Sequence, residues 1–271
     1  MTVHPTAIVE DGARLGDGVE VGPYCLVGPH AVLHDHVRLL SHVVIRGHTE
    51  IGPHTTVHAQ AVLGGEAQMH KHNPPDMRLR IGAHNVIREA VTMSTGSAAG
   101  HGITRVGDHG YFMAGCHVAH DCIVGDNVTL SNGVQLAGHV QVGDGVIMGG
   151  LSAIQQFGRI GRYAFVSGVT GIVADVIPYG SVVGTHARLY GLNLVGLRRR
   201  HVPRPNVHAL RAAYRLIFQT DEGTIHDRAR RAGEEWPDIP EVQDVVVFIL
   251  ADAKRPICPA RQRGRETDDE E

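Results

Sequence analysis

The chain has 271 residues, a formal net charge of −3 and an isoelectric point near 6.7. This near-neutral balance excludes the global basic field expected of a nucleic-acid-binding protein. The N-terminus has no basic-then-apolar signal region, and no apolar run approaches membrane-spanning length. We therefore expect a cytoplasmic protein without membrane insertion.

The first 172 residues carry an apolar residue at every sixth position, with one interruption and one shift of phase. A period of six is neither the 3.6 of a helix nor the 2 of a simple strand. It is typical of the hexapeptide repeats that form a parallel β-helix, a class known for left-handed coils. The series runs Val9, Leu15, Val21, Val27, Leu33, Leu39, Ile45, Ile51, Val57 and Leu63, then Ile81, Ile87 and Met93, then Val106, Phe112, Val118, Val124, Leu130, Leu136, Val142, Met148, Ile154, Ile160, Val166 and Ile172.

Small or β-branched residues precede these apolar ones by two positions, as Cys25, Cys116 and Cys122 do. Residues two apart in a strand point to the same face, so both sets are expected to face inward, and the three cysteines become core residues. Three hexapeptides make one coil, which places residue n beside residue n+18 on the next coil. Glycine often follows the apolar residue, where we expect a turn with unusual dihedral angles.

We predict that residues 1–185 form the β-helix, interrupted by loops at about 65–80 and 94–105. The first loop contains the turn-forming run Asn-Pro-Pro-Asp at 73–76. We expect it to replace one coil's worth of chain without losing the phase, whereas the second changes the phase by one. Loops on rigid scaffolds commonly carry binding function.

Helical spacing replaces the six-residue period from about residue 186, which predicts a C-terminal helical domain at 186–258. Asn206 is expected to cap the first helix, and a second lies near 224–233. A third follows Pro240 and carries its apolar face on Val242, Val245, Val246, Ile249 and Leu250. Residues 259–271 are highly charged and predicted to form a disordered tail, and Cys258 is assigned to a polar segment beside it.

The stretch 115–122 contains the most informative polar residues of the β-helix. Its inward positions are apolar, so His117, His120 and Asp121 are predicted to point outward. The 18-residue rule places Gly138 beside His120 and His139 beside Asp121. A histidine next to the backbone amide of a residue without a side chain is a plausible general base with an oxyanion hole.

A metal site is one alternative, because His117, His120 and His139 are three candidate zinc ligands. Such a site would favour metal-dependent hydration or hydrolysis. The three-residue spacing of the first two is not the i, i+4 arrangement of helical zinc sites, and we assign no metal ligand. A purely structural solenoid is the other alternative.

Six segments resemble the UDP-N-acetylglucosamine 3-O-acyltransferase family, whose members use acyl carrier protein in the first step of lipid A synthesis. The resemblance extends from about Val3 to about Phe248. The segments that carry it are Asn85-Val86-Ile87-Arg88-Glu89, His117-Val118-Ala119-His120-Asp121-Cys122, Leu136-Ala137-Gly138-His139, Gln156-Phe157, Gly191-Leu192-Asn193 and Gly196-Leu197-Arg198-Arg199-Arg200.

This resemblance implies a homotrimeric acyltransferase without a bound cofactor. It would move a 3-hydroxyacyl group from acyl carrier protein to a hydroxyl or amine of a UDP-amino sugar or related nucleotide sugar. His120 would be the general base, Asp121 its support and Gly138 the oxyanion donor. Family positions around the substrates and the nucleotide match Gln68, Lys71, His117, His139, Gln156, Asn193, Arg199 and Arg200. Positions lining the acyl channel match Gly168 and His186.

Four positions depart from the family pattern: Met69, Ser94, Gln155 and Val195. The family has an aspartate, a histidine, another histidine and a glutamate there. A lost hydrogen-bonding partner can change selectivity by orders of magnitude. We therefore hypothesise an intact acyl-transfer site with an altered acceptor, such as another nucleotide sugar or a sugar on a secondary metabolite.

Overall fold

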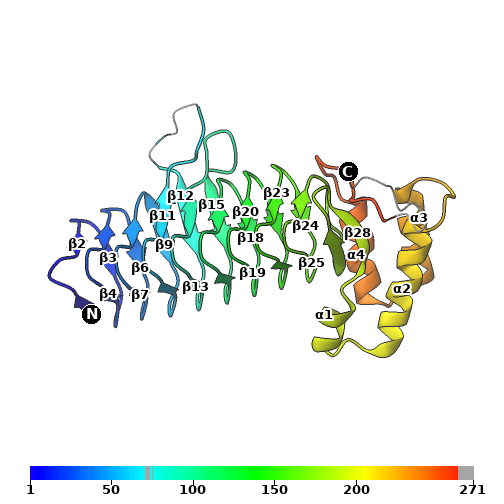
Figure 1. The fold of residues 1–271 in the computed structure, drawn as a ribbon, viewed down its shortest axis with the longest axis horizontal. Coiled ribbons are helices and arrows are strands. Elements are labelled where there is room, and N and C mark those ends of the chain that lie inside the picture. Colours follow the sequence, from blue (N-terminus) through cyan, green and yellow to red (C-terminus); the bar gives the residue numbers. More distant parts are fainter. Residues whose placement is uncertain (71–73, 75, 262–271) are drawn as a thin grey trace, which may run out of the picture.

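The computed structural model describes residues 1–70, 74 and 76–261 as a long three-sided prism with helices at one end (Figure 1). The chain winds through sheets A, B and C in turn, and every pairing between successive coils of the prism is parallel, for example Val118 with Leu136. The predicted β-helix is therefore confirmed in its strand arrangement.

Short strands make up each wall of the prism. Sheet A contains β1 (Thr2–Val3), β4 (Glu20–Val21), β7 (Arg38–Leu39), β10 (Thr56–Val57), β13 (Val86–Ile87), β16 (Tyr111–Phe112), β19 (Thr129–Leu130), β22 (Ile147–Met148), β25 (Phe165–Val166), β27 (Gly180–Val183) and β28 (Arg188–Leu192). Sheet B contains β2 (Ile8–Val9), β5 (Leu26–Val27), β8 (Val44–Ile45), β11 (Val62–Gly65), β14 (Thr92–Ser94), β17 (His117–Val118), β20 (Gln135–Leu136), β23 (Ala153–Ile154) and β26 (Gly171–Ile172). Sheet C contains β3 (Arg14–Leu15), β6 (Val32–Leu33), β9 (His48–Ile51), β12 (Arg78–Ile81), β15 (Ile103–Val106), β18 (Ile123–Val124), β21 (Gln141–Val142) and β24 (Arg159–Ile160).

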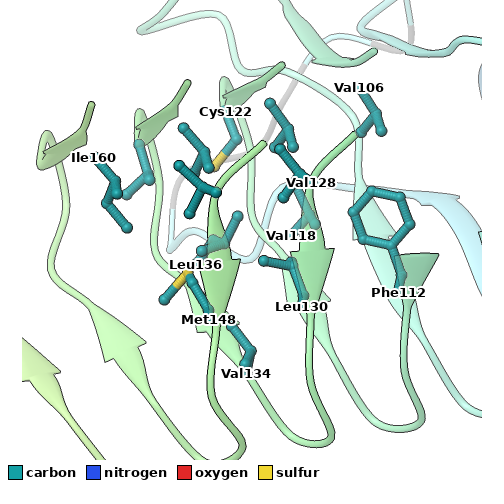
Figure 2. Close-up of a cluster of buried hydrophobic side chains, with 14 of the residues drawn as sticks. Val106, Phe112, Val118, Cys122, Val128, Leu130, Val134, Leu136, Met148 and Ile160 are labelled. Carbon is teal, nitrogen blue, oxygen red and sulfur yellow. The ribbon is translucent and has the colours of Figure 1, made fainter. Parts of the chain in front are cut away.

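The core of the prism consists of the six-residue series. Its members from Val21 to Ile172 are all buried, and only Val9 and Leu15 in the first coil are partly exposed. Figure 2 shows how these side chains fill the interior between the strands, coil upon coil. Cys116 and Cys122 are fully buried among them, as predicted. Burial at every sixth residue explains why the sequence period is so regular.

The glycines that follow the apolar residues are needed for a reason that differs from the predicted one. A β-carbon on Gly22 would overlap the Leu40 carbonyl oxygen on the next coil. At most of these positions successive coils therefore approach too closely for a side chain, although Gly28 has more room, with 3.1 Å to the Ile45 carbonyl oxygen. The left-handed backbone conformation occurs instead two residues later, often at residues other than glycine, such as Tyr24 with φ 58°.

The two predicted loops both leave the corner between sheets B and C, which we call corner BC. They connect β11 to β12 and β14 to β15. The first was predicted to replace one coil, which is wrong: Ile81 pairs with Ile51 in sheet C, so the loop only lengthens one corner. Since the extra length of the loop is a multiple of six residues, the six-residue period continues in the same phase after it. Both loops project from the same edge of the prism in Figure 1.

The helical region contains α1 (Leu194–Arg199), α2 (Arg204–Phe218), α3 (Ile225–Glu235) and α4 (Pro240–Leu250). Asn206 was predicted to cap a helix, but α2 begins at Arg204 after Pro203, and Asn206 instead donates to Glu241. A proline at the start of a helix loses no intrahelical hydrogen bond. The predicted apolar face of α4 is confirmed for Val242, Val245, Val246 and Ile249, which are buried, but is wrong for Leu250, which is 37% exposed.

The segment after α4 returns to the prism. Cys258 was assigned to a polar segment, but it is fully buried. Residues 259–261, predicted to belong to a disordered tail, instead pack on β28, where Ala260 pairs with Leu189. The remainder of that predicted tail, 262–271, lies outside the described residues. None of the helices within the described ranges has the length and apolar character needed to cross a membrane.

Candidate active site

Three consecutive coils place their polar residues together at corner BC. His120 and Asp121 lie on the first coil, Gly138 and His139 on the second, and Phe157 on the third. Asp121, His139 and Phe157 all have left-handed backbone conformations, with φ of 59°, 61° and 63°. This conformation turns the chain at the corner and directs their side chains away from the core of the prism.

His120 and Asp121 form a hydrogen-bonded pair. Nδ1 of His120 lies 2.9 Å from Oδ2 of Asp121. Burial alone would raise the pKa of Asp121, but hydrogen bonds from Ser97 and His120 outweigh it, so this pKa lies below its ordinary value. The aspartate is therefore ionised at neutral pH, which assigns the proton on Nδ1 to His120 and leaves Nε2 as the basic nitrogen.

The two residues were predicted to point outward, and the structure adds a correction. Their side chains point away from the prism core, but both are buried: His120 is 7% exposed and Asp121 1%. Asp121 lies beneath the loop at residues 95–102, which bonds to its carboxylate. Their outward direction was predicted, but their burial was not, because the six-residue period does not reveal the path of the loop that covers them.

Gly138 lies against the imidazole ring of His120, as the 18-residue rule predicts. A β-carbon at Gly138 would lie 2.5 Å from Cε1 and 2.6 Å from Nε2 of His120. Within the described residues, the N–H group of Gly138 has no hydrogen-bond partner. Gly138 thus leaves space for the ring and provides a free amide close to the basic nitrogen.

His139 and His117 flank this pair. Nε2 of His139 lies 4.0 Å from Oδ2 of Asp121, and its ring stacks on Phe157 with 4.5 Å between centroids. Nδ1 of His117 lies 2.8 Å from Oγ1 of Thr92. Burial lowers the pKa of both histidines. Both are therefore neutral hydrogen-bonding groups at neutral pH.

A cavity of about 480 Å³ adjoins His139. It is lined by the loop residues 99–101, by Phe157 and by the segment 252–254, together with Gln141 and Arg159. Nζ of Lys254 lies 4.0 Å from the centroid of the Phe157 ring. The cavity therefore adjoins the candidate site through His139.

The positions of three side chains are compatible with the alternative hypothesis of a metal site. The possible ligand atoms of His120, Asp121 and His139 lie within 4.8 Å of one another, whereas His117 is not part of this group. However, Asp121 already accepts hydrogen bonds from three backbone N–H groups, one hydroxyl and one imidazole. A carboxylate with its lone pairs so occupied fits a charge partner for histidine better than a metal ligand.

The other predicted substrate residues are divided among the three corners of the prism. Gln156 lies at corner BC beside Phe157, and Gln68 is exposed on the first loop of that corner. Lys71 lies outside the described residues.

Asn193, Arg199 and Arg200 lie instead at corner CA, between sheets C and A. The Arg200 guanidinium lies 3.3 Å from the centroid of the Tyr163 ring at that corner. Asn193 caps α1 by accepting from Gly196 N–H and also donates to the Tyr163 carbonyl. In Figure 1, α1 lies at the opposite edge of the molecule from the two loops. One chain therefore does not bring these residues to His120.

Gly168 and His186 are also remote from His120 within one chain. Gly168 lies at corner AB, between β25 and β26, and is exposed. His186 lies between β27 and β28, where it lines a smaller cavity with Tyr190.

Sequence reasoning missed Ser97, His101 and Gly102, which donate hydrogen bonds to the Asp121 carboxylate. They belong to the second loop, whose insertion breaks the 18-residue rule. The one sequence feature that could have indicated these contacts is the position of the loop, which leaves sheet B one coil before His120.

The four departures from the family pattern have different environments. Ser94 is buried in β14, with 4% of its surface exposed, so it offers little to a substrate. Met69, Gln155 and Val195 are exposed.

Comparisons with known proteins agree with the geometry. A profile described as UDP-N-acetylglucosamine O-acyltransferase, domain 2, matches residues 175–258, and one described as bacterial transferase hexapeptide matches residues 30–65. An acyl-acyl-carrier-protein–UDP-N-acetylglucosamine O-acyltransferase of Rhizobium johnstonii is 48% identical over 264 residues, covering 97% of each chain. One of the same name from Caulobacter vibrioides is 53% identical over 207 residues, covering 76% of this chain and 78% of its own.

Solved structures match the fold over nearly the whole chain. One from Acinetobacter baumannii has a TM-score of 0.92 at 36% identity and covers 95% of this chain and 100% of its own. A UDP-N-acetylglucosamine acyltransferase from Campylobacter jejuni has a TM-score of 0.90 at 35% identity, covering 96% and 100%. The predicted left-handed β-helix with a C-terminal helical part is thereby confirmed. The chain belongs to the UDP-N-acetylglucosamine O-acyltransferase family of acyltransferases.

Proposed function

We propose that this enzyme transfers an acyl group from an acyl-carrier-protein thioester to a hydroxyl group of UDP-N-acetylglucosamine. The names of relatives that share about half of their residues with this chain support both substrates. The alternative is that the enzyme acylates a different acceptor, as the changed residues Met69, Gln155 and Val195 suggested. The experiment below distinguishes the two acceptors.

His120 is the general base of the proposed reaction, and its pairing with Asp121 is the observation that carries the proposal. Because Nδ1 is held by Asp121, the lone pair of Nε2 is free to accept the proton of the sugar hydroxyl. The carboxylate then stabilises the imidazolium that forms.

The acyl transfer proceeds by direct attack on the thioester. The deprotonated sugar oxygen forms a bond to the carbonyl carbon, and the negative charge moves to the carbonyl oxygen. The free N–H group of Gly138 donates to that oxyanion. When the carbon–sulfur bond breaks, the imidazolium of His120 returns its proton to the leaving thiolate. The products are a sugar ester and a free carrier-protein thiol, so the chemistry needs no bound cofactor.

A homotrimer would complete this site. The basic residues of α1 and the proposed acyl-channel residues are remote from His120 in one chain, so a second copy has to supply them. Leu151 and Val169 at corner AB are 70% and 63% exposed on successive coils. Such an apolar column is suited to contact another copy.

The proposed roles then divide between two copies. One copy contributes His120 and, around the sugar, Gln68, Lys71, His117, His139 and Gln156. The other contributes Asn193, Arg199 and Arg200 to the nucleotide and Gly168 and His186 to the acyl channel. Arginine forks suit the diphosphate. All four cysteines are free, as is usual in a reducing compartment, which supports a cytoplasmic reaction.

The function is tested by incubating the enzyme with 3-hydroxyacyl-acyl-carrier-protein thioesters and a panel of UDP-sugars, with products identified by mass spectrometry. We expect acylated UDP-N-acetylglucosamine and one free thiol for each ester formed. A tenfold preference for another nucleotide sugar would refute the acceptor assignment. Thioester consumption that does not depend on any acceptor would refute acyl transfer itself.

The oligomeric state is tested by sedimentation equilibrium. We expect three times the chain mass of 29.2 kDa. A Leu151→Asp substitution should shift the population to smaller species and reduce activity. A monomeric wild-type enzyme with full activity would contradict a site shared between copies.

A further inference from the structure

The two carboxylate oxygens of Asp121 have different partners. Oδ1 accepts from the backbone N–H groups of Ser97, His101 and Gly102, at 3.1, 2.8 and 3.1 Å. Oδ2 accepts from the Ser97 hydroxyl at 2.5 Å and from Nδ1 of His120 at 2.9 Å. The amides therefore fix the orientation of the carboxylate, while the hydroxyl acts on the oxygen that His120 uses.

The loop that provides these donors is held in shape by its own backbone. The N–H groups of Gly100 and Gly102 both donate to the carbonyl oxygen of Ser97, at 3.1 Å each. Ser97 and Asp121 are almost entirely buried, with 0% and 1% of their surfaces exposed. Because water does not compete at this depth, hydrogen bonds to the ionised carboxylate are strong.

Ser97 and His120 share one acceptor oxygen. A hydroxyl that donates to Oδ2 draws electron density from it and weakens its attraction for the second donor. The bond from Ser97 is the shorter of the two. The strength with which Asp121 holds a protonated His120 therefore depends on Ser97, although Ser97 bonds to Asp121 and not to His120 or the reacting atoms.

We propose that Ser97 is a positioning residue that acts through Asp121 to limit how strongly the carboxylate stabilises protonated His120. The proposal rests on the function assigned above to His120. With the hydroxyl present, Asp121 orients the imidazole while Nε2 remains available as a base. Without it, Oδ2 binds the imidazolium more strongly, so His120 stays protonated to higher pH and a smaller fraction is competent.

Other titratable groups face this pair. Nε2 of His139 is 4.0 Å from Oδ2, and the His139 and His120 rings meet edge to face at 5.0 Å. His101 and Lys254 interact with His139 from the cavity side, and His117 interacts with His120 from sheet B. Since all these groups remain in every Ser97 variant, a difference between the variants isolates the hydroxyl.

The test compares the pH dependence of kcat/KM for Ser97→Ala, Ser97→Cys and Ser97→Thr. Thr95→Val is the matched control, because Thr95 is a buried hydroxyl residue of the same loop that bonds to Gly65 rather than to Asp121. In the alanine variant, we expect the midpoint of the acidic side of the kcat/KM profile to move to higher pH by about half to one unit. Cysteine, a weaker donor, should give a smaller shift, and the threonine and control profiles should coincide with the wild type.

A purely structural role for Ser97 would give a different result. It would lower kcat/KM by the same factor at every pH, leaving the acid limb in place. An alanine profile that superimposes on the wild type after scaling would therefore overturn the proposal.

A second readout does not depend on activity. Diethyl pyrocarbonate modifies only unprotonated imidazole, so the rate of His120 modification against pH, followed by peptide mass spectrometry on the full-length protein, reports its protonation. Ser97→Ala should raise the midpoint for His120 by the same half to one pH unit, and Ser97→Thr should not. If the wild type acylates no UDP-sugar, the proposed function fails, but this measurement still decides the role of Ser97. An unchanged midpoint in both the alanine and cysteine variants would overturn it.

Discussion

The imidazole ring of His120 lies directly against the backbone of Gly138 on the next coil, where a β-carbon would come within 2.5 Å of Cε1. This contact joins the proposed base to the proposed oxyanion donor. It exists because coils of 18 residues bring equivalent corner positions into register, as the hydrogen bond from His139 N–H to the His120 carbonyl shows.

Substituting Gly138→Ala keeps the backbone N–H but should displace the His120 ring and lower kcat by about a hundredfold or more, the scale on which a positioned general base contributes. The thermal midpoint should change little, since the methyl group is near a side chain rather than backbone. Gly28→Ala is the control, because its β-carbon would lie 3.1 Å from the Ile45 carbonyl oxygen and needs only a slight shift. Normal turnover by Gly138→Ala would show that this contact is not catalytic.

The contact between His120 and Gly138 could be predicted from the sequence because no insertion separates these coils. The contact between Ser97 and Asp121 could not, since the intervening loop breaks the 18-residue register and the path of a loop depends on its own backbone hydrogen bonds. Burial of Cys258 escaped prediction for a similar reason. It depends on pairing with distant strands, to which local polarity gives no guide.

Asp121→Asn should change how stability depends on pH. The folded-state pKa of Asp121 is below its ordinary value, so the ionised group stabilises the fold above its unfolded pKa of about 3.9. That contribution is lost as the pH falls from there through the folded pKa. Thermal midpoints measured from pH 7 to pH 3 should therefore differ most between the two proteins at neutral pH and converge in acid. If the difference in thermal midpoint between the two proteins were the same at every pH, the ionised Asp121 carboxylate would not stabilise the fold.

The cysteine thiols should be unreactive in the folded protein. Burial raises the pKa of Cys116 to about 11 and that of Cys122 to about 12, and Cys25 and Cys258 are also buried with raised pKa values. Because the thiolate is the nucleophile, iodoacetamide at pH 8 should add no label to the native protein and four labels after denaturation. Rapid labelling of the native enzyme would show that the coils open readily.

The C-terminal segment should be held to the prism by the buried pair of Asp175 and Arg159. Nε of Arg159 lies 2.7 Å from Asp175, and the Asp175 backbone bonds to Pro256 and Cys258. Removing one partner of a buried pair costs about 3–5 kcal/mol, so Asp175→Ala should lower the thermal midpoint by several degrees. Glu222→Gln, which breaks an exposed pair with Arg231, should cost less than about 1 kcal/mol. Equal losses of stability in the two variants would contradict the larger contribution assigned to the buried pair.

The most direct test of the proposed chemistry is the rate of acyl transfer to UDP-N-acetylglucosamine by His120→Ala. Because a positioned base typically contributes about 10²–10⁴ in rate, we predict a fall in kcat of that size while the sedimentation mass stays at the wild-type value and the thermal midpoint stays above the assay temperature. Turnover within a few-fold of the wild type would contradict His120 as the general base.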